Sequence, residues 1–372
     1  MITKIDSDNC TGCGTCVKSC SLDVFTLDTG QDNVAPCMAA CPCEADVRGI
    51  MYLLQQDRHE EALEVIRQAI PFPLITGLLC TRPCESACIR HQNGAAVNIR
   101  ALEHFLGLRD IDDYAPPCRE HLARVAVIGS GLAGLACAYF LRNLGYPVTI
   151  FEAAPEAGGW LRTALPPHVL GSQLARLRNL GVSIRYNTVI GPHGDLGFGS
   201  LLQNFSACCV AAGQGSSALQ IHVDSEPLAR SVDPKTMQTA IERIFAAGAV
   251  CGTTDVAGSI AQAKRAADCM DRWLRGADFF SADPEPRRIE NHLPPVLPTW
   301  PRQEDSEQGL SLEAAQVESL RCLTCGSKAR ITHTDDCMTC FSCELSCPCQ
   351  AITVHPFKEA LPRTLQISAK DK

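Results

Sequence analysis

A cysteine-rich fragment occurs twice in this chain of 372 residues, once near each end. The copies span residues 1–28 and 329–356, and each places a Cys-x2-Cys-x2-Cys-x3-Cys run between two short β-type runs. The eight cysteines are Cys10, Cys13, Cys16, Cys20, Cys337, Cys340, Cys343 and Cys347. Most of the chain therefore lies between two matching ends, and any fold must accommodate that arrangement.

This spacing is typical of [4Fe–4S] sites in bacterial ferredoxins, where three thiolates wrap one cubane and the fourth is directed at a neighbouring cluster. Each copy thus resembles half of a two-cluster ferredoxin, and we expect the two halves to meet in space. The fourth cysteine of each run, Cys20 or Cys347, would then complete the cluster held by the other run. If the fragments lie far apart, each run instead closes its own cluster.

Cysteine usage and charge restrict the class of protein. The chain has 23 cysteines, grouped as Cys-x2-Cys, and its first residues lack the pattern of a signal peptide. Both features favour thiolate ligands in a reducing, cytoplasmic compartment over disulfides. Zinc is the alternative, but zinc sites use pairs of Cys-x2-Cys. A formal net charge of -8 and the lack of a long apolar run argue against nucleic acid partners and a membrane span.

Residues 46–70 read as two amphipathic helices with cysteine motifs on either side. The motifs are Pro-Cys37-x3-Cys41-Pro, Cys80-x3-Cys84-x3-Cys88 and Ala-Leu-Glu103-His-Phe. Together they resemble the helical N-terminal domain of the glutamate synthase small-subunit family, which includes the N-terminal part of dihydropyrimidine dehydrogenase. The resemblance implies an α-helical domain that holds two [4Fe–4S] clusters, one of which has a non-cysteine ligand.

The same resemblance implies the ligands of both clusters. The first would be held by Cys41, Cys80, Cys84 and Glu103. The second would take Cys37 and Cys88 and needs two further thiolates, which the family supplies just before the Pro-Cys motif. Here the ferredoxin half occupies that place, so we assign the late pair Cys322 and Cys325.

Some alternatives stay open for these ligands. Cys20 or Cys43 could replace one member of the late pair. Glu103 could be an ordinary surface carboxylate, and His104 beside it is expected to pack or to face solvent. Cys43 and Cys349 each follow a Cys-Pro pair and receive no assignment.

Residues 122–280 open with a complete βαβ dinucleotide-binding fingerprint, in which a buried strand, a glycine turn, a helix and a second strand follow in order. Its turn and acidic residues are Gly129, Ser130, Gly131, Gly134 and Glu152. Gly129 permits the tight turn, Gly131 lets the pyrophosphate approach the helix N-terminus, and Gly134 allows helix–strand contact. Glu152 stands where a carboxylate takes the ribose hydroxyls.

The sequence after Glu152 resembles the FAD sites of the same family. This resemblance adds Ala153, Gly158, Gly159, Leu161, Arg162, Ala212, Gly213, Gly248, Ala249 and Val256 to the expected cofactor-binding residues. Ala249 departs from the family, which has an aspartate there that contacts the ribityl chain. Losing one such hydrogen bond weakens binding by about 1–2 kcal/mol or shifts the flavin potential. The alternative is a vestigial domain that binds no flavin.

The family inserts a second Rossmann domain for NAD(P)H between the Ala-Ala-Gly and Val-Asp-Pro segments. Here only about twenty residues separate Gly213 from Asp233, fewer than the roughly thirty of a single βαβ unit. We therefore expect no NAD(P)H domain, so that any NAD(P) chemistry falls to a partner.

The predicted fold combines an α/β Rossmann-like FAD domain, an α-helical iron–sulfur domain and a bacterial ferredoxin-like module split between the termini. The expected segments are a ferredoxin half (1–28), the helical [4Fe–4S] domain (29–112), the FAD domain (122–280), a linker (281–310), a cluster-binding segment with the second ferredoxin half (311–358) and a tail (359–372).

No hydrolytic triad, acid–base carboxylate pair or phosphate-transfer loop stands out, so FAD and four [4Fe–4S] clusters are expected to carry the chemistry. We predict an electron-transfer oxidoreductase component of a multisubunit complex in anaerobic metabolism. Its partner would be a catalytic dehydrogenase, hydrogenase or reductase subunit, or a ferredoxin. The alternatives are a self-sufficient flavin oxidoreductase that oxidises NAD(P)H or a small substrate, and a structural cluster-bearing scaffold.

Overall fold

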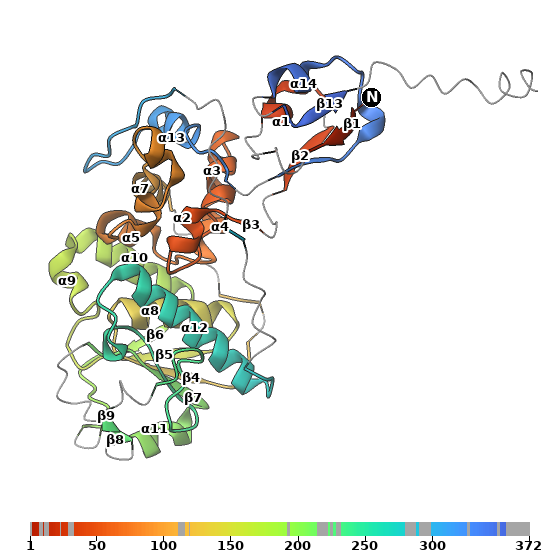
Figure 1. Cartoon of the computed structure of the whole chain (residues 1–372). Coiled ribbons are helices and arrows are strands. Elements are labelled where there is room, and N and C mark those ends of the chain that lie inside the picture. The colour runs from red at the N-terminus through yellow and green to blue at the C-terminus, as the bar shows by residue number, and fades with distance from the viewer. Residues whose placement is uncertain are drawn as a thin grey trace, which may run out of the picture.

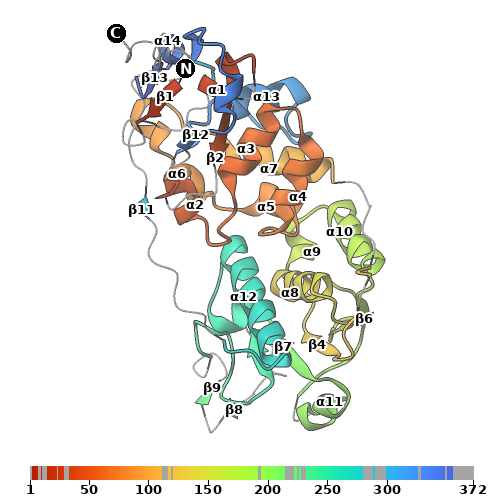
Figure 2. The same ribbon diagram turned by 90° about the vertical axis from the view of Figure 1, so that its right-hand side faces the viewer.

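Three parts follow one another in space in this computed structural model (Figure 1). A Rossmann-like domain lies at one end, a helical domain in the middle and a small ferredoxin-like module at the other end, and a view at a right angle agrees (Figure 2). The structure describes residues 2–6, 10, 15–22, 24–28, 33–110, 116–118, 120–191, 194–213, 222–223, 226–227, 232–279, 288–289, 299–325, 328–347 and 350–354.

A five-stranded parallel sheet with the order β10-β7-β4-β5-β6 forms the Rossmann-like domain. Its strands are β4 (Val125–Ile128), β5 (Val148–Phe151), β6 (Ser183–Arg185), β7 (Ala207–Val210) and β10 (Ile244–Ala246). Its helices are α8 (Leu132–Asn143), α9 (Leu161–Ala164), α10 (Pro167–Asn179), α11 (Phe198–Asn204), α12 (Val256–Leu274) and the 3-10 turn η4 (Gly248–Cys251). In the sequence, a short antiparallel pair of β8 (His222–Val223) and β9 (Glu226–Pro227) follows β7 and precedes β10.

Alternate residues of β4 belong to two separate apolar clusters. Val125 and Val127 pack on the side of α8 and α12, whereas Ala126 and Ile128 pack on the side of α11. Because both faces are covered, the strand reads as a continuous apolar run, as is usual for parallel sheets.

The helical domain is held by a close crossing of two helices. Its helices are α2 (Pro36–Ala40), α3 (Val47–Gln55), α4 (His59–Arg67), α5 (Pro73–Leu79), α6 (Pro83–Ser86), α7 (Ile99–Leu108) and the 3-10 helix η1 (Ile89–Asn93). A Cβ on Gly77 of α5 would lie 2.5 Å from His104 Cα of α7, and one on Gly107 would lie 2.3 Å from Leu74 N. Only glycine fits at these points, so α7 and its Glu103 are fixed against α5, whose C-cap is Cys80.

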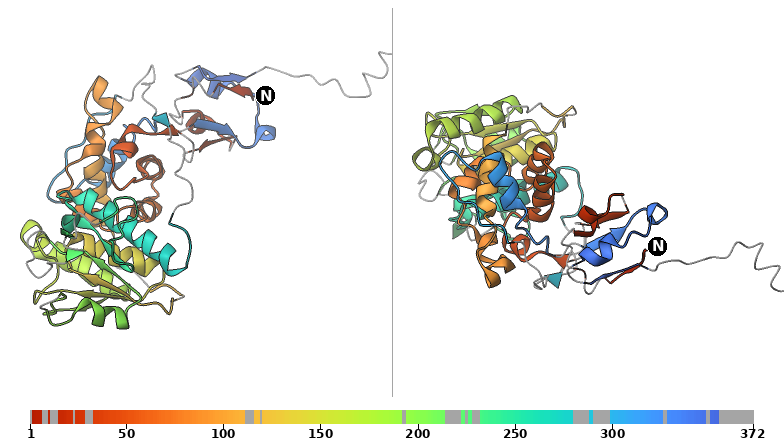
Figure 3. Two further views of the ribbon diagram at one scale, coloured as in Figure 1. Left: turned by 60° about the horizontal axis from the view of Figure 1, so that its bottom comes forward. Right: turned by 90° about the horizontal axis from the view of Figure 1, so that it is seen from above.

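Both ends of the chain build the ferredoxin-like module (Figure 3). β1 (Ile2–Ile5) pairs antiparallel with β13 (Ile352–Val354), and β2 (Phe25–Asp28) pairs antiparallel with β12 (Lys328–Ile331). α1 (Thr15–Ser19) contacts α14 (Ser342–Ser346), and η5 (Thr334–Asp336) precedes α14. A single apolar core takes residues from both fragments. The prediction that the two halves meet is therefore confirmed.

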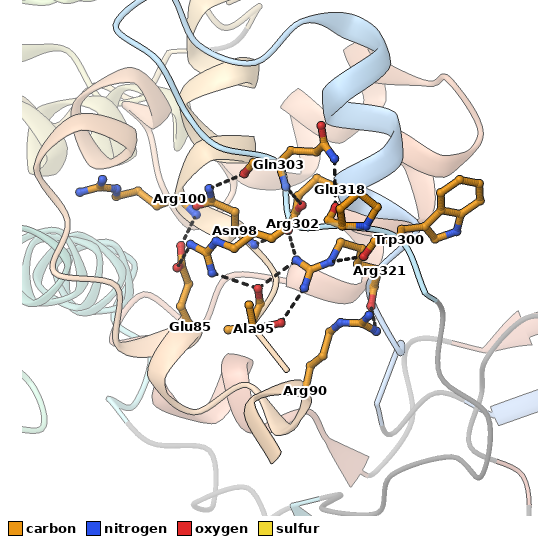
Figure 4. A network of polar contacts seen from close by, with 12 residues as sticks. Glu85, Arg90, Ala95, Asn98, Arg100, Trp300, Arg302, Gln303, Glu318 and Arg321 are labelled. Atoms are coloured by element: carbon orange, nitrogen blue, oxygen red, sulfur yellow. Dashed lines mark hydrogen bonds and ion pairs between the residues drawn. The ribbon is translucent and has the colours of Figure 1, made fainter. Parts of the chain in front are cut away.

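Residues 299–325, including α13 (Leu312–Ser319), pack on the helical domain (Figure 4). The buried Glu318 accepts from Asn98 N and from Gln303 N, both at 2.7 Å, and forms an ion pair with Arg321. This network fastens the C-terminal segment beside η1 and the start of α7.

Further contacts extend the docked segment toward the expected linker. Arg302 Nη1 donates to Ala96 O at 3.0 Å, and buried His104 Nδ1 lies 3.3 Å from Asp305 Oδ2. β11 (Arg288–Ile289) also pairs in parallel with β3 (Asn33–Val34). The segment predicted as an extended connector over residues 281–310 is thus docked over at least residues 299–310, because its polar groups find partners on the helical domain.

Candidate iron–sulfur and dinucleotide sites

One cavity of the ferredoxin-like module joins the two chain ends. Cys20 of the first fragment lines it together with three cysteines of the second fragment, Cys337, Cys340 and Cys343. The rest of the lining comes from both fragments and is mostly apolar. This is the grouping that crossed ligation requires, and the ligation itself stays a prediction.

The other cysteines of the module lie in or against its apolar core. Cys10 and Cys16 are buried, and Cys347 packs against them in the same cluster. Ala329 N donates to Cys10 Sγ at 3.5 Å, and Ala351 N donates to Cys347 Sγ at 3.3 Å. Backbone N–H groups aimed at sulfur stabilise thiolate charge and tune cluster potentials. The predicted ligand Cys13 and the unassigned Cys349 lie outside the described residues.

Four thiols from opposite ends of the sequence line a second cavity, here called the four-thiol site. They are Cys37, Cys88, Cys322 and Cys325. The structure thus brings the late pair to the helical domain. The two alternative ligands lie elsewhere, since Cys20 lines the ferredoxin cavity and Cys43 lies beside Cys41.

The cysteines of the four-thiol site shape each other's ionisation. Burial raises the pKa of Cys37, and charge on Cys322, Cys325 and Cys88 adds to the effect. Burial also raises the pKa of Cys322 to about 12. Thiols of this kind keep their protons at neutral pH unless a metal replaces them, which couples metal binding to proton release.

A third group, the mixed site, contains Cys41, Cys80, Cys84 and Glu103. Burial raises the pKa of Cys80 to about 11, and the charges of Glu103 and Cys41 add to this. Burial and Cys41 likewise raise the pKa of Glu103 to about 8, against a hydrogen bond with Thr76. Glu103 is half-buried on α7, and its role as a ligand stays a prediction.

Cys43 connects the mixed site to the Rossmann-like domain. A hydrogen bond with Cys43 lowers the pKa of Cys41 to about 6. Cys43 Sγ also donates to Ala257 O of α12 at 3.2 Å. Cys43 thus lies at the contact between two domains.

A cavity of about 430 Å³ lies at the carboxyl ends of β4, β5 and β7. Nine of the expected cofactor-binding residues line it: Gly129, Ser130, Gly131, Glu152, Ala153, Gly159, Ala212, Gly213 and Ala249. Gly129 has a φ of +98°, and a Cβ there would lie 2.7 Å from Ala211 O. A Cβ on Gly131 would meet nothing within 4 Å, whereas one on Gly134 would lie 2.0 Å from Gly129 O. The backbone is therefore open where a phosphate would approach and tight where helix and loop pack.

Glu152 is fixed to the glycine loop. Its Oε2 accepts from Ser130 N at 2.9 Å and from Ser130 Oγ, and its Oε1 accepts from Ala154 N at 2.9 Å. The carboxylate is thereby positioned on the cavity wall next to the turn.

Six expected residues are not part of this lining: Gly134, Gly158, Leu161, Arg162, Gly248 and Val256. Gly158 N donates to Ser130 O at 3.2 Å and Gly248 N donates to Gln262 Oε1 at 2.9 Å, so both shape the walls from behind. Arg162 pairs with Glu156 and lines a separate cavity with Tyr186.

Sequence reasoning missed residues 188–190 and Ser259, which also line the cavity. Residues 188–190 follow β6, and the carboxyl ends of parallel strands meet at one edge of a sheet. That rule could have found them, because β6 has the pattern of a short strand. Ser259 gives no such signal, since only packing decides which face of α12 meets the cavity.

The donor sets fit cubanes better than a single ion. Among the described residues no three His, Cys, Asp or Glu side chains converge as ligands of one metal ion. A [4Fe–4S] core is larger, and thiols spread around a cavity wall suit its corners. The open glycine turn and the fixed carboxylate likewise suit a dinucleotide.

Three family models match the chain. They are a dihydropyrimidine dehydrogenase domain II 4Fe–4S cluster domain over residues 31–112, an NAD(P)-binding Rossmann-like domain over residues 127–178 and a 4Fe–4S binding domain over residues 1–22. The chain thus has [4Fe–4S]-binding domains and a Rossmann-like dinucleotide domain, as predicted.

Curated relatives include subunits of larger redox enzymes. The NADPH-Fe(3+) oxidoreductase subunit beta of Geobacter sulfurreducens is 37% identical over 195 residues, covering 48% of this chain and 28% of the relative. The NADP(+)-dependent formate dehydrogenase subunit beta of Moorella thermoacetica is 31% identical over 214 residues, covering 50% and 30%. The NAD-dependent dihydropyrimidine dehydrogenase subunit PreT of Escherichia coli is 33% identical over 168 residues, covering 42% and 40%. The chain therefore spans less than half the length of these relatives.

Among solved structures, Thermovibrio ammonificans THI4 overlaps 41% of this chain and 90% of its own, with a TM-score of 0.30 and 14% identity, too little to argue from. Within the described part of the chain, no helix is both long and apolar enough to cross a membrane.

Proposed function

Because the chain is related to the dihydropyrimidine dehydrogenase-like iron–sulfur oxidoreductases, we propose that it is an electron-transfer subunit of a multisubunit redox complex. It relays electrons between a partner subunit, a chain of [4Fe–4S] clusters and FAD. A location in the cytoplasm stays a prediction.

The continuity of the sites is the observation that carries this proposal. Cys325 stands just before β12 of the ferredoxin-like module, and Cys37 lies in α2, whose C-cap is Cys41. One short helix thus connects the four-thiol site to the mixed site. Cys43 then contacts α12, whose Ser259 lines the dinucleotide cavity. Neighbouring sites of this kind suit stepwise electron transfer from one end of the molecule to the other.

We assign four [4Fe–4S] clusters and one FAD to these sites. The eight ferredoxin cysteines hold two clusters in crossed fashion, and the four-thiol and mixed sites hold one each. Bound FAD exchanges two electrons where each cluster exchanges one. In the dinucleotide cavity, Gly131 leaves space for the pyrophosphate. The carboxylate of Glu152, held by Ser130, accepts hydrogen bonds from the ribose hydroxyls.

The partner supplies any NAD(P) chemistry in this proposal. The chain offers one Rossmann-like fingerprint, and the segment between Gly213 and Asp233 is too short for another βαβ unit. The partner is therefore a catalytic dehydrogenase, hydrogenase or reductase subunit, or a ferredoxin that docks at the module.

Iron, sulfide and flavin analysis combined with reduction assays tests the proposal. We expect roughly sixteen irons and one FAD per chain, reduced by dithionite or by a low-potential ferredoxin but not by NAD(P)H alone. Rapid bleaching by NADH would overturn the relay in favour of a self-sufficient flavin oxidoreductase. A flavin-free preparation whose clusters no donor reduces would favour a structural scaffold.

A further inference from the structure

Two buried arginines lie among the cysteines of the four-thiol site. Arg48 on α3 is 2% exposed and Arg90 on η1 is 5% exposed, and both line the same cavity as the four thiols. Arg48 Nη1 donates to Cys325 O at 3.2 Å. Arg90 Nη1 donates to Arg321 O, also at 3.2 Å, directly before Cys322 (Figure 4). The backbone carbonyls of Cys325 and of Arg321, the residue before Cys322, thus hold both guanidinium groups at the cavity.

A third arginine nearby provides a contrast. Arg321 is equally buried, but it forms an ion pair with the buried Glu318 and donates to three backbone carbonyls. Its charge is therefore compensated within the docking network. Arg48 and Arg90 instead line the cavity together with the four thiols, so their charges lie at its wall.

The mixed site contains a carboxylate, Glu103, beside its three cysteines. Glu85, next to Cys84 on α6, forms an ion pair with Arg302 at 3.1 Å and accepts from Arg100 N at 2.9 Å. Burial raises the pKa of Glu103, and the charge of Arg100 opposes this effect. The two sites of the helical domain thus differ in their side chains, because two arginines line the four-thiol cavity whereas a carboxylate belongs to the mixed site.

We propose that Arg48 and Arg90 raise the reduction potential of the cluster at the four-thiol site. Reduction adds one electron to a cluster, one iron passes formally from ferric to ferrous, and the site becomes more negative by one charge. A buried cation stabilises the reduced form more than the oxidised form. The electron comes from the neighbouring cluster, which is oxidised by the same one electron. The inference rests on the proposed cluster assignment.

Redox titration of the full chain monitored by electron paramagnetic resonance tests this inference. Arg48→Gln and Arg90→Gln are made separately, because the two arginines lie on different elements. Each is expected to lower the midpoint potential of the cluster at the four-thiol site by at least about 59 mV. That shift is a tenfold change in the equilibrium of a one-electron reduction. The matched variants Arg48→Lys and Arg90→Lys keep the positive charge, so their midpoint potential is expected to stay close to that of the wild-type chain. Arg100→Gln is the control. Arg100 lies beside the mixed site, so this variant leaves the midpoint potential of the cluster at the four-thiol site unchanged.

The outcomes separate this inference from the proposed function. A wild-type chain without clusters defeats the proposed function. A wild-type chain with full iron content, whose midpoints stay fixed in both glutamine variants, overturns the role of the arginines alone. Loss of about four irons from both glutamine variants also overturns it, because the arginines would then hold the site together rather than set its potential.

Discussion

The Rossmann-like domain and the ferredoxin-like module are assembled in opposite ways. The parallel sheet and its cavity come from one continuous stretch, from β4 at Val125 to the end of α12 at Leu274. In the module, Ile2 pairs with Val354, so nearly the whole chain lies between two paired residues. Closing a long flexible loop costs entropy, although this cost grows only slowly with length. The folded middle domains remove most of that cost, because they bring the two ends together.

Because of this difference, the iron–sulfur sites depend on segments that lie far apart in the sequence. The dinucleotide cavity needs only its own βαβ unit and nearby loops. The four-thiol site instead needs the docked segment 299–325, and the ferredoxin cavity needs both fragments. Substitutions at the chain ends should therefore remove iron without affecting the nucleotide cavity, and substitutions in the glycine loop should do the reverse.

The largest effect is expected from the double substitution Cys322→Ser and Cys325→Ser. It removes half of the thiols of the four-thiol site, so about four irons per chain should be lost while the flavin content stays unchanged. Iron and flavin analysis of the purified chain measures this. Cys118→Ser is the control, since Cys118 is exposed and lines none of these cavities. Full iron content in the double variant would contradict the assignment of the late pair.

Crossed ligation can be tested by comparing single and double variants. Cys20 and Cys340 lie on different fragments but line one cavity. If they hold the same cluster, Cys20→Ser with Cys340→Ser should cost about four irons, no more than the more damaging single change. If each run closes its own cluster, the double variant should lose about eight. Iron counts from the three variants decide between these outcomes.

The sequence could predict those parts of the fold that depend on local patterns. The repeated cysteine spacing predicted the paired chain ends, and the glycine fingerprint predicted the order of β4, α8 and β5. Tertiary packing decided the remaining features. No local signal shows that Arg48 turns into the four-thiol cavity, that Arg162 points away from the dinucleotide cavity, or that residues 299–310 dock.

A substitution in the glycine loop should have the reverse effect, with loss of flavin and retention of iron. A Cβ on Gly131 meets no protein atom within 4 Å, so Gly131→Val should fold but fill the space that the pyrophosphate needs. We expect at least a hundredfold weaker FAD binding, about 2.8 kcal/mol, with full iron content. Flavin titration by fluorescence measures the loss. Gly199→Val on α11, where a Cβ also meets nothing within 4 Å, is the control. Loss of iron together with flavin in Gly131→Val would mean that the two ends are not independent.

The smallest effect is expected at Ala249, which lines the dinucleotide cavity at the position where the family resemblance implies an aspartate. Ala249→Asp adds one acceptor toward the ribityl hydroxyls and should strengthen FAD binding by about 1–2 kcal/mol, the value of one such hydrogen bond. Ala249→Leu adds bulk without an acceptor and should not strengthen binding. The iron content and the cluster potentials should stay the same in both variants, because the change is confined to the continuous domain. Equal or weaker flavin binding in Ala249→Asp would show that the cavity holds its ligand in a different pose, with the flavin away from η4.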